Sequence, residues 1–338
     1  MGFKQLLEKI YDRENLTIAE SRDALLCMLE GACEPPQISA FLAVLHMKGE
    51  TAEELAGFAL AMRQMAVKVP FNGSRTLDTC GTGGDRKGSF NISTVTAFVV
   101  AGAGIPVTKH GNRASSSLCG SADLLEALGI RTRFNPEEAA QALEQAKFTF
   151  LFAPDYHPAT QSVAHVRRML GVPTLFNYLG PITNPANPAA QLIGVFNKKG
   201  MELMAAAIRL LEPEKKVLLV HSTGGWDEAT TCGDFIMYDS AGQQTTRNAS
   251  EFGMQNCSVE DLSGEGPDVN AAIALSILKG EKGPKRDAVL LNAAFAIQLY
   301  HPHCTIEKSL LSAMASLDSG EALNVVRKLQ EKFPVKAL

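Results

Sequence analysis

The sequence lacks the features that mark several common classes of protein. No apolar run reaches the roughly 18–20 residues that a membrane-spanning helix needs, and the N-terminal segment MGFKQLLEKI has no signal-peptide core. Basic residues are not in excess, because 32 Lys and Arg against 36 Asp and Glu give a net charge of −4. This balance argues against a nucleic-acid footprint. We therefore expect a cytoplasmic protein with neither a membrane nor a nucleic acid as its partner.

The cysteines form no disulfide or zinc framework. They are scattered, odd in number and nowhere spaced as Cys-x-x-Cys: Cys27, Cys33, Cys80, Cys119, Cys232, Cys257 and Cys304. This pattern favours reduced thiols in a cytosolic protein and argues against structural zinc. The segment HPHC, which contains His301, His303 and Cys304, is interpreted as a loop rather than as a metal site.

What the chain does contain predicts two domains. Its 338 residues are 46% hydrophobic, enough to bury a substantial core. Residues 1–70 show only helical patterns, with capping boxes at Thr17–Glu20 and Thr51–Glu54, and predict a small all-helical domain of four helices. We expect an α/β domain over residues 71–338, and a segment near 165–190 that joins the helical domain.

The α/β prediction rests on strands that alternate with helices, which indicates a central, mostly parallel sheet flanked by helices on both faces. Extended segments are expected at 75–80, 105–111, 148–154, 215–221 and 234–240, and helices at 93–104, 121–129 and 136–146. The stretch PTLFNYLGPITNPANP (173–188) is rich in proline and asparagine, and it is interpreted as an ordered loop or an interdomain crossing.

The segment DTCGTGGDRKGSFNIST (78–94) stands out by its glycines. It follows an expected strand and leads into an expected helix, where exposed backbone N–H groups and a helix N-terminus form an anion site. A Walker A loop is excluded because Lys87 precedes the last glycine. A dinucleotide fingerprint is excluded because Arg86 stands where its third glycine belongs. The alternative is a tight glycine turn without a ligand.

A second polar cluster, KHGNRASSSLCGSAD (109–123), follows the next expected strand. Adjacent parallel strands end at the same edge of a sheet, so this cluster is expected to line the crevice of the glycine segment. The residues expected there are Lys109, His110, Asn112, Arg113 and Ser115 to Ser117. Lys109 and Arg113 are expected to clamp a polyanion.

Seven segments in this order resemble the anthranilate phosphoribosyltransferases of tryptophan biosynthesis. They are GTGGD, FNIST, KHGNR, GSADLLEALG, FAPDYHPA, FNYLGPITNP and DEAT. The resemblance covers nearly the whole chain. It implies transfer of phosphoribose from phosphoribosyl pyrophosphate (PRPP) to the amino group of anthranilate with release of pyrophosphate, and a homodimer formed through the helical domains.

The resemblance also implies roles for individual residues. The positions that match the PRPP site are Gly81, Gly84, Asp85, Ser89, Asn91, Ser93, Thr94, Lys109, Ser117 and Ser121. Those that match the Mg²⁺ site are Ser93, Asp227 and Glu228. Those that match the anthranilate side are Gly81, His110, Asn112, His157 and Arg167. Among these, Lys109, His110 and Arg167 are the expected catalytic residues.

The residue types suit this chemistry independently. Mg²⁺ favours oxygen ligands and is often held by one or two carboxylates together with phosphates, and the adjacent Asp227 and Glu228 supply carboxylates. The alternative is that this pair is solvent-facing charge. An aromatic amine is uncharged at neutral pH, so catalysis can rest on orientation and charge stabilisation, with Lys109 and the metal at the leaving pyrophosphate. His110 is at most a weak proton acceptor, and Arg167 is expected to pair with the anthranilate carboxylate.

The match to the family pattern is not complete. Arg86 stands where we expect a glycine, Ser89 replaces the commoner threonine, Val172–Pro173 lacks an arginine, and Trp226 stands where we expect a smaller residue. Two other functions remain as alternatives: a pyrimidine nucleoside phosphorylase-like enzyme, suggested by HSTGG at 221–225, and a catalytically inactive relative that binds nucleic acid.

Overall fold

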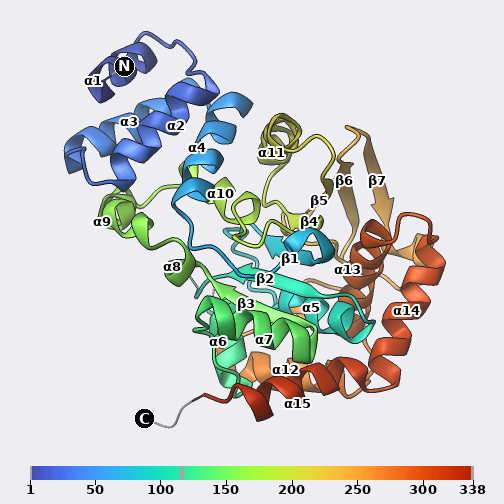
Figure 1. The fold of residues 1–338 in the computed structure, drawn as a ribbon. Helices are drawn as coiled ribbons and strands as arrows, with labels where there is room; N and C mark the ends of the chain where they lie inside the picture. Colours follow the sequence, from blue (N-terminus) through green and yellow to red (C-terminus); the bar gives the residue numbers. More distant parts are fainter. Residues whose placement is uncertain (1, 115–117, 336–338) are drawn as a thin grey trace.

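A computed structural model describes residues 2–114 and 118–335 of the chain. Its elements form a helical lobe and a larger α/β lobe, as the sequence predicts (Figure 1). Among the described residues, none of the helices combines the length and the apolar character needed to cross a membrane.

The helical lobe begins with the four helices expected in the first 70 residues. Thr17 and Thr51 cap two of them, because each side-chain oxygen accepts the backbone N–H of the glutamate three residues later. Two later helices, from the middle of the chain, pack against them (Figure 1). The helices of this lobe are α1 (Phe3–Tyr11), α2 (Ile18–Leu29), α3 (Pro35–Lys48), α4 (Ala52–Met65), α9 (Gln161–Leu170) and α10 (Phe176–Ile182).

The α/β lobe contains one seven-stranded sheet with the strand order β3-β2-β1-β4-β5-β6-β7. The first five strands in the chain are parallel, and the last two join the edge as antiparallel partners. The strands are β1 (Leu77–Gly81), β2 (Val107–Gly111), β3 (Phe148–Phe152), β4 (Ala190–Gly194), β5 (Lys216–Ser222), β6 (Asp234–Asp239) and β7 (Gln244–Asn248). This confirms the expected mostly parallel sheet.

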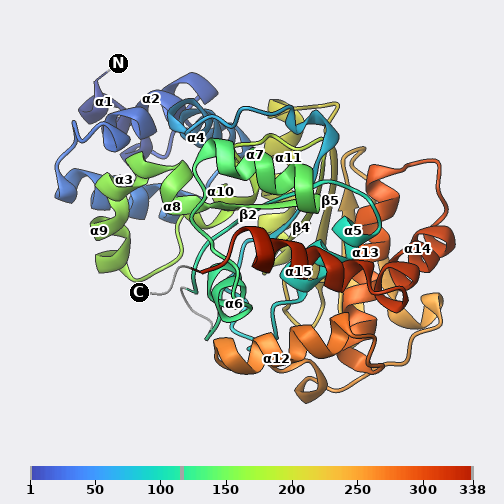
Figure 2. The ribbon, with the colours of Figure 1, turned by 60° about the horizontal axis from the view of Figure 1, so that its bottom comes forward.

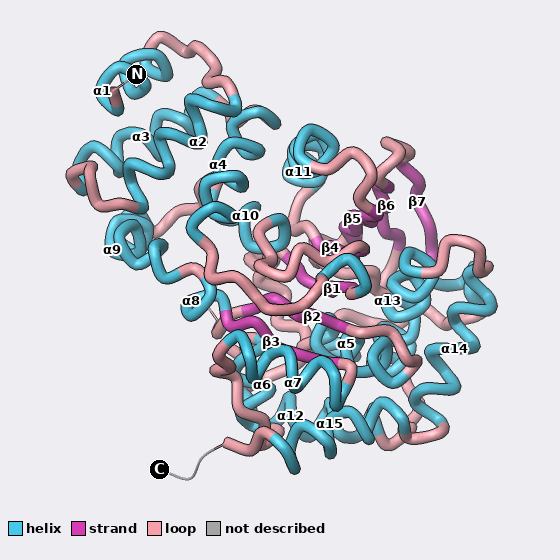
Figure 3. The backbone as a smooth tube through the Cα atoms, in the orientation of Figure 1, coloured by secondary structure: helices cyan, strands magenta, loops and turns pink. Residues whose placement is uncertain are grey.

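Helices cover both faces of this sheet, as the tube in Figure 3 and the rotated view in Figure 2 show. On one face α5 and α13 lie against the strands, with α14 and α15 packed behind α5. On the other face α11 packs on β5 and also contacts α4 of the helical lobe. The remaining helices are α5 (Ile92–Gly102), α6 (Ser121–Ala127), α7 (Pro136–Ala146), α8 (Ala153–Tyr156), α11 (Lys198–Leu211), α12 (Pro267–Leu278), α13 (Pro284–Tyr300), α14 (Ile306–Asp318) and α15 (Glu321–Lys332).

Two buried clusters of apolar side chains form the core. One joins α5, α7 and α12–α15 to the sheet. The other fills the helical lobe and continues through α10 and α11 to Ile193 and Leu219, which lie on β4 and β5. The helical lobe therefore shares its core with one face of the sheet.

The sequence analysis missed one helix and two strands. Residues 173–188 were interpreted as an ordered loop or an interdomain crossing, and the loop interpretation is wrong, because α10 occupies the middle of the segment and buries Phe176, Leu179 and Ile182. Strands β4 and β7 were not predicted. β4 lies at the centre of the sheet between β1 and β5, so its omission left out one strand that borders the crevice.

Candidate active site

A cavity of about 420 Å³ opens at the carboxyl ends of β1 and β2, between the two lobes. Most of the predicted site residues line it: Gly81, Gly84, Asp85, Ser89, Asn91, Ser93, Lys109, His110, Asn112, Ser121, His157, Arg167, Asp227 and Glu228. Thr94 is fully buried instead, and its hydroxyl donates to that of Ser121 at 3.1 Å. Ser117 and its neighbours Ser115 and Ser116 lie outside the described residues.

The cavity has two walls of different composition. The glycine wall consists of the cavity-lining residues within 81–93, Lys109 and the pair Asp227–Glu228. The histidine wall consists of His110, His157, Arg167 and the cavity-lining residues within 176–183.

The glycine wall begins where β1 and β4 end side by side. Gly81 and Gly194 are paired in register, and the loop that carries Asp227 lies directly on them. A Cβ atom on Gly194 would overlap the carbonyl of Asp227, and one on Gly81 would overlap its carboxylate. These glycines are therefore required because two loops approach each other closely.

Beyond Gly81 the chain turns through left-handed backbone conformations. Gly83, Gly84 and Gly88 have φ values of 64°, 85° and 68°. Arg86, the departure from the expected glycine, adopts φ of 56°, a conformation in which most side chains are strained. The substitution thus keeps the backbone path that a glycine would take.

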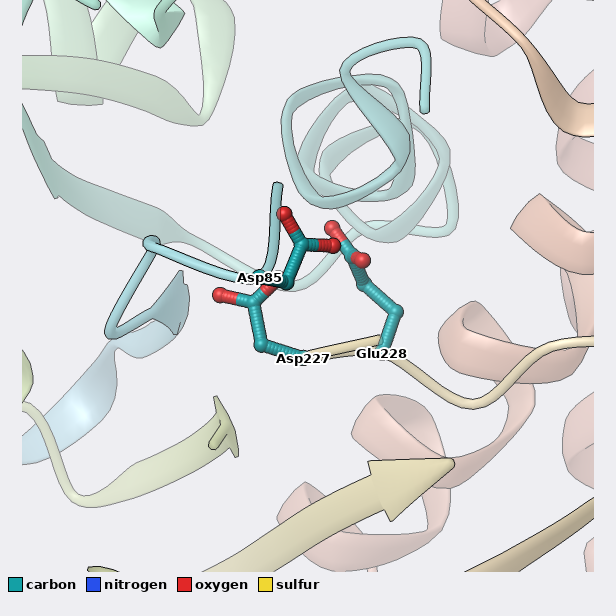
Figure 4. A group of neighbouring side chains, drawn as sticks. All are labelled: Asp85, Asp227 and Glu228. Atoms are coloured by element: carbon teal, nitrogen blue, oxygen red, sulfur yellow. The ribbon is translucent and has the colours of Figure 1, made fainter. Parts of the chain in front are cut away.

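Three carboxylates meet at the base of the glycine wall. Asp85, Asp227 and Glu228 each offer an oxygen atom, and these atoms lie within 4.8 Å of one another (Figure 4). Gly83 donates its backbone N–H to Asp227 Oδ2 at 2.8 Å, whereas Asp85 Oδ2 and Glu228 Oε2 are buried without a hydrogen-bond partner among residues 2–114 and 118–335. Buried oxygens without partners at such a separation fit a hard divalent cation.

The pKa values of these carboxylates are those expected for acidic groups that are buried close together. Burial, and after it the neighbouring Asp85 carboxylate, raise the pKa of Asp227 to about 6. Burial also raises the pKa of Glu228 well above its ordinary value, with Asp227 as the second cause. A cation between the three groups would remove the repulsion and return these pKa values toward normal. In the described part of the chain, this is the only group of three such ligands, and His301, His303 and Cys304 belong to none.

Lys109 extends from β2 beneath the glycine loop. The side chain is buried, and Nζ donates to the carbonyl of Thr79 at 2.5 Å and to the hydroxyl of Ser93 at 3.3 Å. Burial lowers its pKa, while the nearby acidic groups oppose this effect. Ser93 belongs to the first turn of α5, so an anion beside it would meet both the ammonium group of Lys109 and the N-terminus of this helix.

Asn91 forms the N-terminal cap position of α5 and is held by two partners. Its Nδ2 donates to the carbonyl of Cys119 at 2.9 Å, and its Oδ1 accepts from Asn270 Nδ2 at 2.9 Å. Asn270 is buried on α12, far along the chain, and the sequence analysis did not identify it.

The histidine wall is organised by backbone carbonyls. His110 Nδ1 lies 3.0 Å from the carbonyl of Gly180, and His157 Nε2 lies 3.0 Å from that of Thr183. The two rings meet edge to face with centroids 5.2 Å apart. Burial lowers the pKa of His110 to about 3 and that of His157 to about 4, so both rings are neutral at pH 7.

The hydrogen bond to Gly180 fixes the tautomer of His110. Because a carbonyl only accepts, the proton of the neutral ring lies on Nδ1 and Nε2 carries the lone pair. This Nε2 is buried, and no described residue forms a hydrogen bond with it. The wall therefore presents one acceptor atom that a ligand can satisfy.

Arginine residues near the cavity divide into two kinds. Arg167 lines the cavity, and its guanidinium lies 4.6 Å from the ring centre of Phe176. Arg113 was expected to clamp a polyanion, but its guanidinium pairs with Asp123 at 2.8 Å and Glu126 at 2.7 Å. Arg113 therefore lines the cavity as expected, but the predicted clamp is wrong, because α6 already supplies two carboxylates to its guanidinium.

Trp226, another departure from the family pattern, anchors the acidic loop. Its side chain is buried, and Lys87 Nζ lies 5.2 Å from its ring centre. This cation–π contact connects the glycine loop to the residue next to Asp227.

Comparison with known proteins assigns both lobes. Residues 4–66 match the glycosyl transferase family helical bundle domain, and residues 73–323 match the glycosyl transferase family a/b domain. Anthranilate phosphoribosyltransferases from Desulfitobacterium hafniense and Persephonella marina are 46% and 41% identical. The alignments cover 94% of both chains in the first case, and 97% of this chain and 98% of the relative in the second. The chain belongs to the anthranilate phosphoribosyltransferase family.

Solved structures of family members agree with this assignment. The Thermus thermophilus anthranilate phosphoribosyltransferase superposes with a TM-score of 0.90 at 38% identity, covering 96% of this chain and 98% of the other. The Saccharomyces cerevisiae enzyme in complex with PRPP and Mg superposes with a TM-score of 0.91 at 28% identity, covering 97% of each chain.

Proposed function

We propose that this chain carries out the reaction of its family, the transfer of the 5-phosphoribosyl group from PRPP to the amino group of anthranilate, with pyrophosphate as the second product. One observation carries the proposal: a single cavity combines an anion site with three converging carboxylates on one wall and neutral histidines beside Arg167 on the other. The glycine wall suits PRPP, which is an anion that binds together with a divalent cation. The histidine wall suits anthranilate, which has an uncharged amine and a carboxylate.

The glycine wall is the proposed PRPP site. The glycine loop and the start of α5 offer backbone N–H groups to the phosphates, apart from those of Thr82 and Gly83, which already donate to Gly194 and Asp227. The residues that line the same space are Gly81, Gly84, Ser89, Asn91, Ser93 and Ser121. Thr94 acts through Ser121, to which it donates. Lys109 stabilises the negative charge that grows on the leaving pyrophosphate. Ser117 keeps the role that the family resemblance implies.

Mg²⁺ is the proposed cofactor. Asp227, Glu228 and Asp85 would hold it, with Ser93 on the opposite side of the same space. When bound, the ion neutralises pyrophosphate and helps it to leave. The fit of the site rests on the two buried carboxylate oxygens that no protein group satisfies.

The histidine wall is the proposed anthranilate site. Arg167 pairs with the carboxylate, while Asn112 and His157 line the pocket for the ring. His110 Nε2 accepts a hydrogen bond from the amine and so orients its lone pair toward the ribose. Because the amine is already neutral and the pKa of His110 is low, orientation rather than proton removal is its main contribution.

The surroundings of the enzyme are also part of the proposal. We place the protein in the cytoplasm as a homodimer formed through the helical lobe, with domains at residues 1–70 and 71–338 joined near 165–190. Three exposed apolar side chains on α1, α3 and α9 support such an interface: Tyr11, Met47 and Met169. Sedimentation of the purified protein measures the assembly.

The fluorescence of anthranilate provides the direct test. Purified protein, PRPP, Mg²⁺ and anthranilate are mixed, and the loss of anthranilate fluorescence is followed. A decay that requires the protein, PRPP and Mg²⁺ together is the expected result. If no decay occurs while PRPP binds in a titration, anthranilate is not the acceptor. Phosphate-dependent cleavage of a pyrimidine nucleoside would then favour the phosphorylase, and tight RNA binding without PRPP binding would favour the nucleic-acid relative.

A further inference from the structure

A buried carboxylate lies one layer behind the histidine wall. Asp78 on β1 is fully buried and does not line the cavity. Its Oδ2 accepts from Asn184 Nδ2 at 2.9 Å and from Gln191 Nε2 at 3.3 Å. The backbone N–H of His110 approaches Oδ1 at 3.4 Å. The ammonium group of Lys109 favours the charged form of Asp78 electrostatically, but the side-chain hydrogen bonds to this carboxylate come from the two amides. The role of these amides therefore needs an explanation of its own.

The two amides connect Asp78 to the segment that carries the wall. Gln191 Nε2 also donates to the carbonyl of Pro181 at 2.7 Å. Asn184 Nδ2 also donates to the carbonyl of Thr108 on β2 at 2.8 Å, and its Oδ1 accepts the N–H of Ala186 at 2.9 Å. Residues 181–186 are thus tied at both ends to the sheet beneath them.

The same segment determines what the histidines present to the cavity. Its carbonyls at Gly180 and Thr183 are the partners of His110 Nδ1 and His157 Nε2. A carbonyl displaced by 1 Å would lose its histidine partner, because these distances are already 3.0 Å. His110 would then be free to place its proton on Nε2 and would offer a donor where the wall now offers an acceptor.

We infer that Asp78, Asn184 and Gln191 are positioning residues for the amine acceptor: they fix the carbonyls that hold His110 and His157 in the orientation and tautomer that the acceptor meets. The inference rests on the proposed function for the identity of the acceptor. It assigns these residues no contact with either substrate. Among the described residues, the hydrogen bonds of Asn184 and Gln191 reach no residue of 81–94, so we expect their effect mainly on the histidine wall. Asp78 also acts electrostatically on Lys109 of the glycine wall, and for this reason the test uses an amide.

The test compares two buried amides that serve different walls. Gln191→Met keeps the length of the side chain and removes its hydrogen bonds. We expect it to raise the KM for anthranilate about 10-fold, the equivalent of roughly 1.4 kcal/mol, and to change the KM for PRPP less than about 2-fold. Asn270→Leu, which removes the partner of Asn91 on the glycine wall, should do the reverse. Thermal unfolding of both variants controls for general destabilisation.

A second measurement does not depend on turnover. In protein labelled with ¹⁵N-histidine, NMR should show His110 as the Nδ1–H tautomer in the wild type and a mixture of tautomers in Gln191→Met. The inference is overturned if the tautomer of His110 is unchanged and both KM values shift together. That result would show that Gln191 contributes only to packing. If the wild type consumes no anthranilate, the proposed function fails, and the tautomer measurement still decides the inference.

Discussion

The glycine wall and the histidine wall face each other across one cavity, yet they are built in opposite ways. The glycine wall leaves groups unsatisfied, because Asp85 Oδ2 and Glu228 Oε2 are buried without partners. The histidine wall engages one nitrogen of each histidine with a backbone carbonyl, and among its described residues His110 Nε2 is the buried side-chain atom without a partner. The first wall therefore needs its ligand to relieve repulsion, whereas the second is organised before any ligand arrives.

The largest effect should follow from removing the charge of the glycine wall. The double variant Asp227→Asn, Glu228→Gln preserves shape and removes two of the three carboxylates. We expect Mg²⁺-dependent turnover to fall at least about 1000-fold, the equivalent of roughly 4 kcal/mol of transition-state stabilisation. Glu202→Gln, on the exposed surface of α11, is the matched control. Full activity in the double variant would remove the metal from this site.

A purely steric change should disturb the same wall without altering any charge. In Gly194→Ala the added methyl group overlaps the carbonyl of Asp227, so the acidic loop must move. We expect roughly 100-fold lower turnover and a loss of about 1–3 kcal/mol in the free energy of unfolding. Gly266→Ala, where a Cβ meets no atom within 4 Å, should change neither quantity appreciably. Steady-state kinetics and urea unfolding measure both quantities. If the two variants have the same turnover and the same free energy of unfolding, Gly194 and the carbonyl of Asp227 do not approach each other closely.

Neighbouring arginines test the histidine wall. Arg167 lies over Phe176 and lines the cavity, whereas Arg168 does not. Arg167→Gln should raise the KM for anthranilate about 10–100-fold, as expected for the loss of one charge-assisted hydrogen bond, and should leave the KM for PRPP nearly unchanged. Arg168→Gln should match the wild type in both. Steady-state kinetics in which each substrate is varied separately measures the difference. If Arg168→Gln raises the KM for anthranilate more than Arg167→Gln does, the acceptor site does not lie at Arg167.

The two walls should also respond to pH with opposite signs. The pKa values of His110 and His157 are depressed to about 3 and 4, so below pH 6.5 the unfolded chain binds protons first and the free energy of unfolding falls as pH drops. Each histidine contributes a loss of about 1.4 kcal/mol at pH 5.5. The raised pKa of Asp227, about 6, acts the other way, because the native state then binds the proton first.

Denaturant unfolding without Mg²⁺ at pH 7.5 and 5.5 separates these contributions. Relative to the wild type, His157→Asn should lose less stability on acidification, and Asp227→Asn should lose more. If all three proteins share one slope, the ionisation described for both walls is wrong.

The sequence predicted the glycine wall better than the histidine wall, for a physical reason. The glycine wall is largely one continuous segment, whose glycines and short polar side chains reveal a close approach to the backbone. The histidine wall depends on partners far apart in the chain, since Asp78 is separated by 106 residues from Asn184 and by 113 from Gln191. Buried amides of this kind have no local signal, because Asn and Gln are ordinary surface residues elsewhere.

Two wrong predictions show the same limit of reasoning from local sequence. Arg113 looked like a clamp because the serines beside it suggested a phosphate site, but Asp123 and Glu126 on the next helix neutralise it. The prolines and asparagines of 173–188 suggested a loop, although Phe176, Leu179 and Ile182 form an apolar helical face. In both cases tertiary contacts decided what composition alone could not.

The shared core of the helical lobe has a consequence for how the chain folds and can be divided. Side chains of α4, α10 and α11 pack together with Ile193 and Leu219 of the central sheet. A fragment that begins at residue 73 would carry this apolar sheet face and the inner sides of α10 and α11 uncovered, and it would aggregate rather than fold alone. Residues 67–72, between the two matched family segments, thus separate two sequence families. They do not separate two parts that fold independently.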